Sequence, residues 1–205
     1  MVIRVGILTV PVRDDAAIQA VTQKLRQALP RTVVMQESSA PSQRNWIEEL
    51  LRRWCDEEEL DLVITIGGTF PAPGSSAAEI VPEATLSVIE RLLPGLPEAM
   101  RAYAQEQSEL ALLDRSVAGI RGRSCLFNLP AGAAPAALFF EAIADVLGPL
   151  IAHLQVEPSA PTLADVLEIE QQTEGEPGVE EALGAGKGLK AEEFAAFLQR
   201  KRSAD

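Results

Sequence analysis

The stretch Asp61-Leu62-Val63-Ile64-Thr65-Ile66-Gly67-Gly68-Thr69 decides the fold of this chain. Its apolar run, rich in β-branched side chains, predicts a strand that is buried on both faces. The glycines that follow end this strand at a loop where the backbone can approach a ligand closely, and such a loop suits an anionic group. An ordinary strand-to-helix turn is the alternative interpretation of these residues taken alone.

Strands and helices are expected to alternate ahead of this stretch. Residues 2–10 and 31–35 predict strands, and residues 14–29 and 44–60 carry apolar side chains at helical spacing. The order strand, helix, strand, helix, strand is typical of right-handed crossovers and a parallel sheet. We therefore expect an α/β fold, a three-layer α/β/α sandwich with a mostly parallel sheet.

Two loops of small residues are candidates for a binding site. Residues 67–81 form a long loop after the buried strand, where open α/β sheets bind ligands, and a helix is expected over 82–93. A second helix is expected over 96–107. Residues 124–129 predict another strand, which leads through the second loop into a helix over 136–154. Two loops at strand ends can face one pocket.

The chain is acidic, with a net charge of −12, which argues against binding to nucleic acid or to an anionic membrane. Half of this charge lies in residues 156–205, which carry 11 acidic and 5 basic side chains. Their glycine- and glutamate-rich composition predicts an acidic linker with helical segments over 163–171 and 190–202. We expect an α/β domain over 1–155 and an extension that docks on this domain, on a neighbouring subunit or on a protein partner.

Three side-chain types limit the chemistry of the chain. Cys55 and Cys125 have no second ligand-type residue at metal spacing, so we expect buried free thiols. His153 is the only histidine, and a capping or surface role is favoured for it over catalysis. Arg121 and its cationic neighbours Arg115 and Arg123 are candidate anion contacts in an acidic chain, with solvated arginines as the alternative.

Neither a membrane helix nor a signal peptide is expected. The chain has no apolar run near the ~20 residues that a membrane helix requires. Met1 leads directly into the first strand, without a cationic start or a cleavage site. We therefore expect a cytoplasmic protein.

Several segments in order carry a family resemblance: Asp61 to Thr69, Pro82-Glu-Ala-Thr-Leu-Ser-Val-Ile-Glu-Arg91, Pro94-Gly-Leu-Pro-Glu-Ala-Met-Arg101, Ser116-Val-Ala-Gly-Ile-Arg-Gly122 and Asn128-Leu-Pro130. Over residues 2–154 the chain resembles the molybdopterin adenylyltransferase family, with bacterial molybdenum cofactor biosynthesis proteins of the MogA and MoaB type and the corresponding gephyrin domains. The resemblance implies a homotrimer with a pocket for molybdopterin, a pterin that bears a dithiolene and a terminal phosphate. In active members this phosphate attacks the α-phosphate of ATP, with Mg²⁺.

The resemblance also implies roles for particular residues. Thr69 and Ser116 are expected to contact phosphates, Arg121 to act as a cationic clamp, and Glu79 to be the remaining catalytic and magnesium carboxylate. The other members of the implied molybdopterin and phosphate site are Gly67, Gly68, Gly119, Pro130 and Gly132.

Departures from the family pattern fall on the glycines and carboxylates of the site. Phe70 stands where the family has a glycine, and the family's aspartate before the Pro-Glu-Ala-Thr motif is missing, with Glu79 the nearest acid. We therefore expect a molybdopterin-binding protein of molybdenum cofactor biosynthesis with altered or lost adenylyl transfer. The alternatives are an active adenylyltransferase that uses Mg²⁺ and ATP, and a noncatalytic paralogue that docks a partner.

Overall fold

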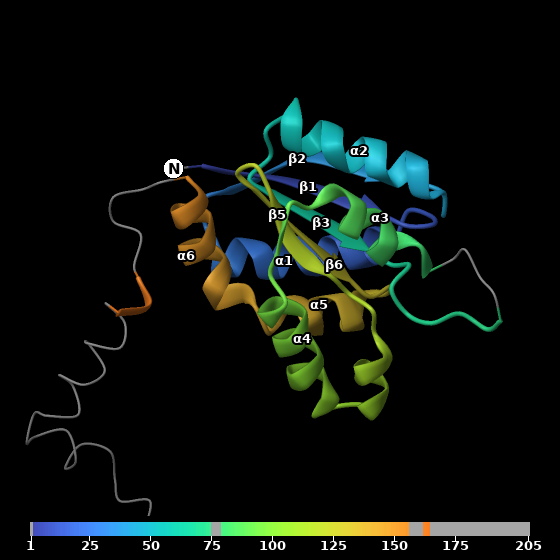
Figure 1. The fold of residues 1–205 in the computed structure, drawn as a ribbon. Helices are drawn as coiled ribbons and strands as arrows, with labels where there is room; N and C mark the ends of the chain where they lie inside the picture. The colour runs from blue at the N-terminus through green and yellow to red at the C-terminus, as the bar shows by residue number, and fades with distance from the viewer. Residues whose placement is uncertain (1, 75–78, 156–161, 165–205) are drawn as a thin grey trace, which may run out of the picture. The chain divides into compact units, whose positions relative to one another are not determined.

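One six-stranded sheet, in the order β2-β1-β3-β6-β5-β4, forms the centre of the computed structural model, which describes residues 2–74, 79–155 and 162–164 (Figure 1). The elements are β1 Ile3–Thr9, α1 Asp15–Ala28, β2 Thr32–Ser39, α2 Arg44–Asp56, β3 Leu62–Ile66, α3 Val81–Val88, β4 Arg91–Leu92, α4 Gly95–Gln105, η2 Glu109–Leu113, β5 Ala118–Arg121, β6 Ser124–Leu129, α5 Ala133–Glu141 and α6 Ala144–Leu154. Strands β2, β1, β3 and β6 are parallel, and β5 is antiparallel to both of its neighbours. The expected mostly parallel α/β fold is confirmed.

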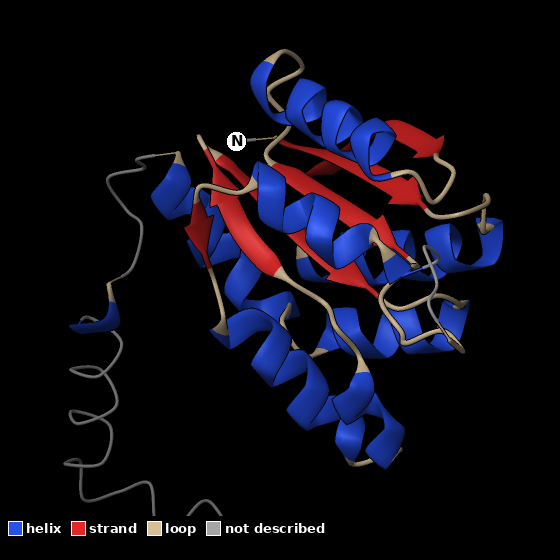
Figure 2. Ribbon diagram, turned by 45° about the vertical axis from the view of Figure 1, so that its right-hand side comes forward, coloured by secondary structure: helices blue, strands red, loops and turns tan. Residues whose placement is uncertain are grey.

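Helices cover both faces of this sheet (Figure 2). On one face α1, α4, α5 and α6 pack against alternate strand residues such as Ile64 and Phe127. On the other face α2 and α3 pack against the intervening residues Val63 and Leu126. All five residues of β3 are buried, as expected for a central strand whose two faces are both covered by helices.

A buried amide joins four of the family motifs inside the fold. The Asn128 side chain of β6 donates to the hydroxyls of Thr65 in β3 and Thr85 in α3, at 2.8 Å each. Its oxygen accepts the N–H of Val117 at 3.0 Å. Asn128 and both threonines are 2% exposed or less, so this buried network holds α3 against the sheet.

Several sequence-based boundaries differ from the structure, among them the helix expected over 44–60, which ends at Asp56. The strand expected over 31–35 continues to Ser39, because the following polar residues pair with β1 at the sheet edge. The helix expected over 82–93 ends at Val88, since the next residues pair with β5 as the short strand β4. The helix expected over 136–154 is two helices that meet at 142–143.

The chain divides into two units, Met1–Ala160 and Pro161–Asp205, and all the elements named above belong to the first. The helices expected over 163–171 and 190–202 lie outside the described residues, except for 163–164. Among the described helices, none is long and apolar enough by itself to cross a membrane. The pair α5 and α6 has the necessary length and composition only together, with a bend of 63° between them.

Candidate functional site

Two loops leave the sheet side by side at the carboxyl ends of β3 and β6. The last residues of these strands, Ile66 and Leu129, are in register, and the N–H of Gly67 donates to the Leu129 carbonyl at 2.9 Å. The loop that begins at Gly67 and the loop that begins at Pro130 therefore start from neighbouring points on one sheet edge. Ligands of open α/β sheets bind at such an edge.

The backbone at two glycines of these loops requires the absence of a side chain. Gly67 has a φ of +94°, and a Cβ atom there would lie 2.2 Å from the Val10 carbonyl oxygen. Gly132 has a φ of +92° and precedes the first turn of α5. Residues with a Cβ rarely adopt these angles, so both glycines fix the shape of the loops.

Asp114 is the centre of the polar contacts behind these loops. Its Oδ2 accepts the hydroxyl of Thr69 at 2.6 Å, and its Oδ1 accepts the Ser116 N–H at 2.8 Å. The Ser116 hydroxyl also donates to Oδ1. All three residues are 4% exposed or less. The two hydroxyls that the family resemblance assigns to phosphates therefore donate to a carboxylate of the protein itself.

Asp114 was not among the residues that the sequence singled out. It is one of 30 acidic residues, and its partner Thr69 lies 45 positions earlier in the chain. The available signal was its place two residues before Ser116, since serine often bonds a nearby carboxylate locally. That signal was too common in an acidic chain to identify the site.

Arg115 joins the loop after β3 to the first turn of α3. Its Nη1 lies 3.0 Å from Glu79 Oε2, and its Nη2 contacts Glu83 Oε1. The hydrogen bonds that Arg115 donates to Glu83 and then to Glu79 raise the pKa of Arg115. The N–H of Ala72 donates to the second oxygen of Glu79 at 3.4 Å. Both oxygens of Glu79 thus have partners in the protein.

A magnesium site does not fit these residues. Mg²⁺ binds one or two carboxylates that face the ion and are not already bound to a cation. Here the guanidinium of Arg115 binds both Glu79 and Glu83. Within the described ranges, no group of three or more histidine, cysteine, aspartate and glutamate side chains is placed to hold a metal ion.

Gly119 and Arg121 are not brought to the two loops. Arg121 is paired with Ser124 at the first residue of β6, whereas the loops leave from its last residue, roughly 16 Å away along a strand of this length. Its guanidinium forms two bonds to Asp56, of 2.8 and 2.6 Å. A Cβ atom on Gly119 would lie 2.6 Å from the Ile89 side chain, so this glycine serves packing. The three arginines expected to form a cationic cluster have different partners. Arg115 binds Glu79 and Glu83, Arg121 binds Asp56, and Arg123 donates to Gln155.

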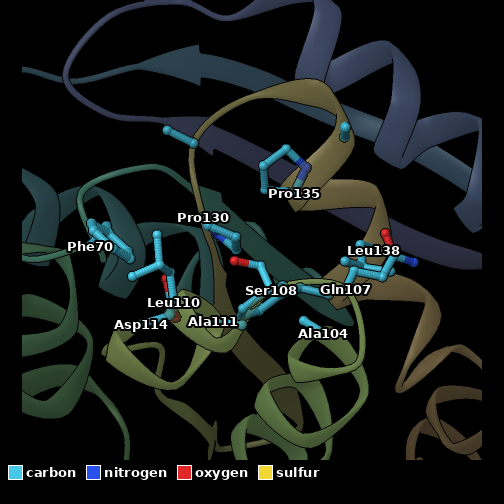
Figure 3. A pocket seen from close by; sticks show the side chains of 13 residues that line it. Phe70, Ala104, Gln107, Ser108, Leu110, Ala111, Asp114, Pro130, Pro135 and Leu138 are labelled. Carbon is cyan, nitrogen blue, oxygen red and sulfur yellow. The ribbon is translucent and has the colours of Figure 1, made fainter.

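A cavity of about 470 Å³ opens beside Asp114 (Figure 3). Its walls come from the loop after β3, from α4 and η2, and from the loop and helix that follow β6. The walls are mainly apolar, with Phe70, Leu110, Pro130 and Leu138 among them, and the polar side chains are those of Gln107, Ser108 and Asp114. A mainly apolar cavity with a few polar groups is typical of a small-molecule site.

The part of the chain that lines this cavity is similar to known proteins. Residues 9–153 match the model of the family described as "Probable molybdopterin binding domain". The molybdopterin adenylyltransferase of Helicobacter pylori (strain J99) is 35% identical over 134 residues, which are 62% of this chain and 74% of the relative. The molybdopterin adenylyltransferase of Escherichia coli (strain K12) is 30% identical over 157 residues, 74% of this chain and 78% of the relative.

A solved structure agrees with these matches. The crystal structure of the molybdopterin biosynthesis enzyme MoaB from Thermus thermophilus is similar with a TM-score of 0.67 and 34% sequence identity. The similarity covers 76% of this chain and 98% of that one. The family match, the identity and the shared fold all concern the part of the chain that holds the two loops and the cavity. The chain therefore belongs to the molybdopterin-binding domain family of molybdenum cofactor biosynthesis, of the MogA and MoaB type.

Proposed function

We propose that this chain binds molybdopterin in the cavity beside Asp114 and that standard adenylyl transfer is altered or lost. The observation that carries the second part is that Thr69 and Ser116 both donate to the Asp114 carboxylate. These hydroxyls are committed to a negative charge inside the protein. A phosphate in the same place would meet that carboxylate and be repelled by it.

In this proposal the backbone N–H groups after β6, and not the Thr69 and Ser116 hydroxyls, bind the phosphate end of molybdopterin. Helix α5 begins after Gly132, and within the described residues no side chain caps its first N–H groups. Free N–H groups at a helix N-terminus favour an anion. In this proposal Gly67, Gly68, Pro130 and Gly132 shape the loops, and Thr69 and Ser116 orient Asp114.

The second candidate is an active enzyme that adenylates molybdopterin with Mg²⁺ and ATP. It is favoured by the names of the two bacterial relatives, both called molybdopterin adenylyltransferase. Against it stand the ion pairs of Glu79 and Glu83 with Arg115, which leave neither of these two carboxylates free for a metal. The third candidate, a noncatalytic paralogue that only docks a partner, predicts a cavity that retains no pterin.

Two measurements separate these candidates. The first is retention of molybdopterin by the purified full chain after expression in cells that make it, measured by oxidation to a fluorescent pterin. The second is formation of adenylated molybdopterin with Mg²⁺ and ATP, with the E. coli relative as positive control. We expect retention without turnover. Turnover at the rate of the control would overturn the proposed loss, and absence of retained pterin would overturn the binding function.

Three further properties stay predictions that rest on the sequence and the family resemblance. They are homotrimer assembly, a cytoplasmic location and a protein partner for residues 156–205. Light scattering of the full chain tests the trimer, with a molar mass three times that of the chain as the expected result. Deletion of residues 156–205 tests the partner. Unchanged assembly together with unchanged pulldown from cell extract would count against it.

A further inference from the structure

The carboxylate of Asp114 has a hydrogen-bonding capacity that its protein partners do not fill. A carboxylate offers about four acceptor positions on its two oxygens. Among the described residues, Ser116 supplies two donors to Oδ1, and Thr69 supplies one donor to Oδ2. One acceptor position is thus left on Oδ2 of a residue that lines the cavity and is 4% exposed.

The surroundings of this carboxylate select a neutral donor. In the described part of the chain no cation pairs with it; the Arg115 guanidinium binds Glu79 and Glu83 instead. The nearby Arg101 reaches only backbone carbonyls, those of Asp114 and Ser116, at 3.4 and 3.3 Å. An anionic ligand group would be repelled by this carboxylate, which has no ion-pair partner among the described residues, whereas an N–H group would gain a charge-assisted hydrogen bond.

The wall of the cavity offers apolar surface and an aromatic ring to a ligand. Proline and leucine side chains form much of its wall, and the ring of Phe70 lines it while being 46% exposed. An aromatic side chain at this position offers a face on which a heterocycle can stack. Phe70 is one of the departures from the family pattern, and Asp114 is the carboxylate of the same cavity.

We propose that Asp114 is a specificity-determining residue that recognises the amino edge of the pterin ring. A 2-amino-4-oxopteridine carries two N–H donors on its 2-amino group, at one edge of the ring, and Oδ2 of Asp114 accepts one of these two. The phosphate-bearing end then points away from this carboxylate. This inference rests on the proposed function, because it assigns the pterin end of the same ligand.

The test compares probes that differ only at this edge. Pterin itself, 2-amino-4-oxopteridine, is titrated into the full-length protein by fluorescence at pH 7. Its counterparts are the 2-dimethylamino analogue, which lacks the amino donors, and 2,4-dioxopteridine, which presents a carbonyl in place of the amino group. We expect pterin to bind about 10- to 100-fold more tightly than either analogue, the range for a hydrogen bond to a charged group. Equal affinities would overturn the inference without any variant.

Variants give the second arm. Asp114→Asn keeps the shape and should lose about tenfold or more in pterin affinity together with the preference over 2,4-dioxopteridine. Asp145→Asn makes the same chemical change at an exposed site on α6 and should leave both affinities unchanged. An Asp114→Asn protein that is folded by circular dichroism and keeps the wild-type preference overturns the inference.

The outcome is separable from that of the proposed function. If molybdopterin is retained but the three probes bind equally well, the role of Asp114 is contradicted and molybdopterin binding is supported. Absence of both retention and pterin binding overturns the proposed function itself.

Discussion

The hydroxyl of Thr69 donates to Oδ2 of Asp114 at 2.6 Å, and both residues are 4% exposed or less. This bond ties the loop after β3 to the segment before β5, across 45 positions of sequence. The family resemblance assigns Thr69 to the ligand, whereas the structure shows that its hydroxyl already serves an interior carboxylate. A residue of the binding motif is thus also a stabilising residue.

Thr69→Val should therefore lower the free energy of unfolding by about 1–3 kcal/mol, because it leaves one oxygen of a buried carboxylate without a donor. Urea unfolding measures this change. Thr32→Val is the matched control, since its hydroxyl is buried without a hydrogen-bond partner among the described residues and its loss should cost little. Equal effects of the two substitutions would mean that the bond to Asp114 contributes nothing to stability.

Arg115 should keep divalent cations out of the site. Arg115→Gln removes the guanidinium from between Glu79 and Glu83, so the two carboxylates become available to a metal. We expect Mg²⁺ affinity, measured by calorimetry, to rise about tenfold, which corresponds to ~1.4 kcal/mol. The double variant Arg115→Gln/Glu79→Gln should lose that gain. Tight Mg²⁺ binding by the wild type would contradict the assignment.

Arg121 should matter for stability and not for the ligand. Its two bonds to Asp56 raise its pKa, and the same bonds lower the pKa of Asp56. The pair is partly exposed, so Arg121→Gln should cost about 1 kcal/mol or less. Pterin retention should be unchanged by this substitution. Loss of retention in a folded Arg121→Gln protein would restore the clamp that the resemblance implies.

The sequence could predict the elements whose cause is local. Strand β3 was predictable because its run of four apolar residues and one threonine is recognisable without its pairing partners. The loops after β3 and β6 were predictable from their glycines. Strand β4 was not, because only its pairing with β5 makes two residues, Arg91 and Leu92, a strand. The break between α5 and α6 was missed for a different reason. The apolar pattern continues across it, and Ile143 at the break is itself buried.

The candidate site was less predictable than the fold because its polar partners are distant in sequence. Asp56 bonds Arg121 from 65 positions away, and Glu79 bonds Arg115 from 36 positions away. Spacing within a motif gives no information on such pairs. The motif around Arg121 therefore identified the family correctly. Its arginine nevertheless lies beside the first residue of β6, at the opposite end of this strand from the two loops.

Asn128 should be among the most costly single positions of the fold. Asn128→Leu removes an amide that holds two hydroxyls and one N–H. The hydroxyls of Thr65 and Thr85, which are buried, and the N–H of Val117, which is half-buried, lose this partner. We expect a loss of about 3 kcal/mol or more in urea unfolding. Thr65→Val removes one bond of the three and should cost about 1 kcal/mol. A small loss for Asn128→Leu would mean that the network is replaceable by apolar packing.

The two cysteines, confirmed as buried free thiols, should make the protein sensitive to alkali. Burial raises the pKa of the Cys55 thiol to about 11 and that of Cys125 to about 12, against about 8.5 for a thiol in an unfolded chain. Above pH 9 the unfolded chain therefore releases thiol protons that the folded protein keeps, so stability falls as pH rises. The slope is about 1.4 kcal/mol per pH unit for each thiol. Cys125→Ala should reduce the slope measured by urea unfolding between pH 9 and about 11, because one of the two thiols no longer titrates. An unchanged slope in that variant would show that the Cys125 thiol does not contribute to alkaline unfolding.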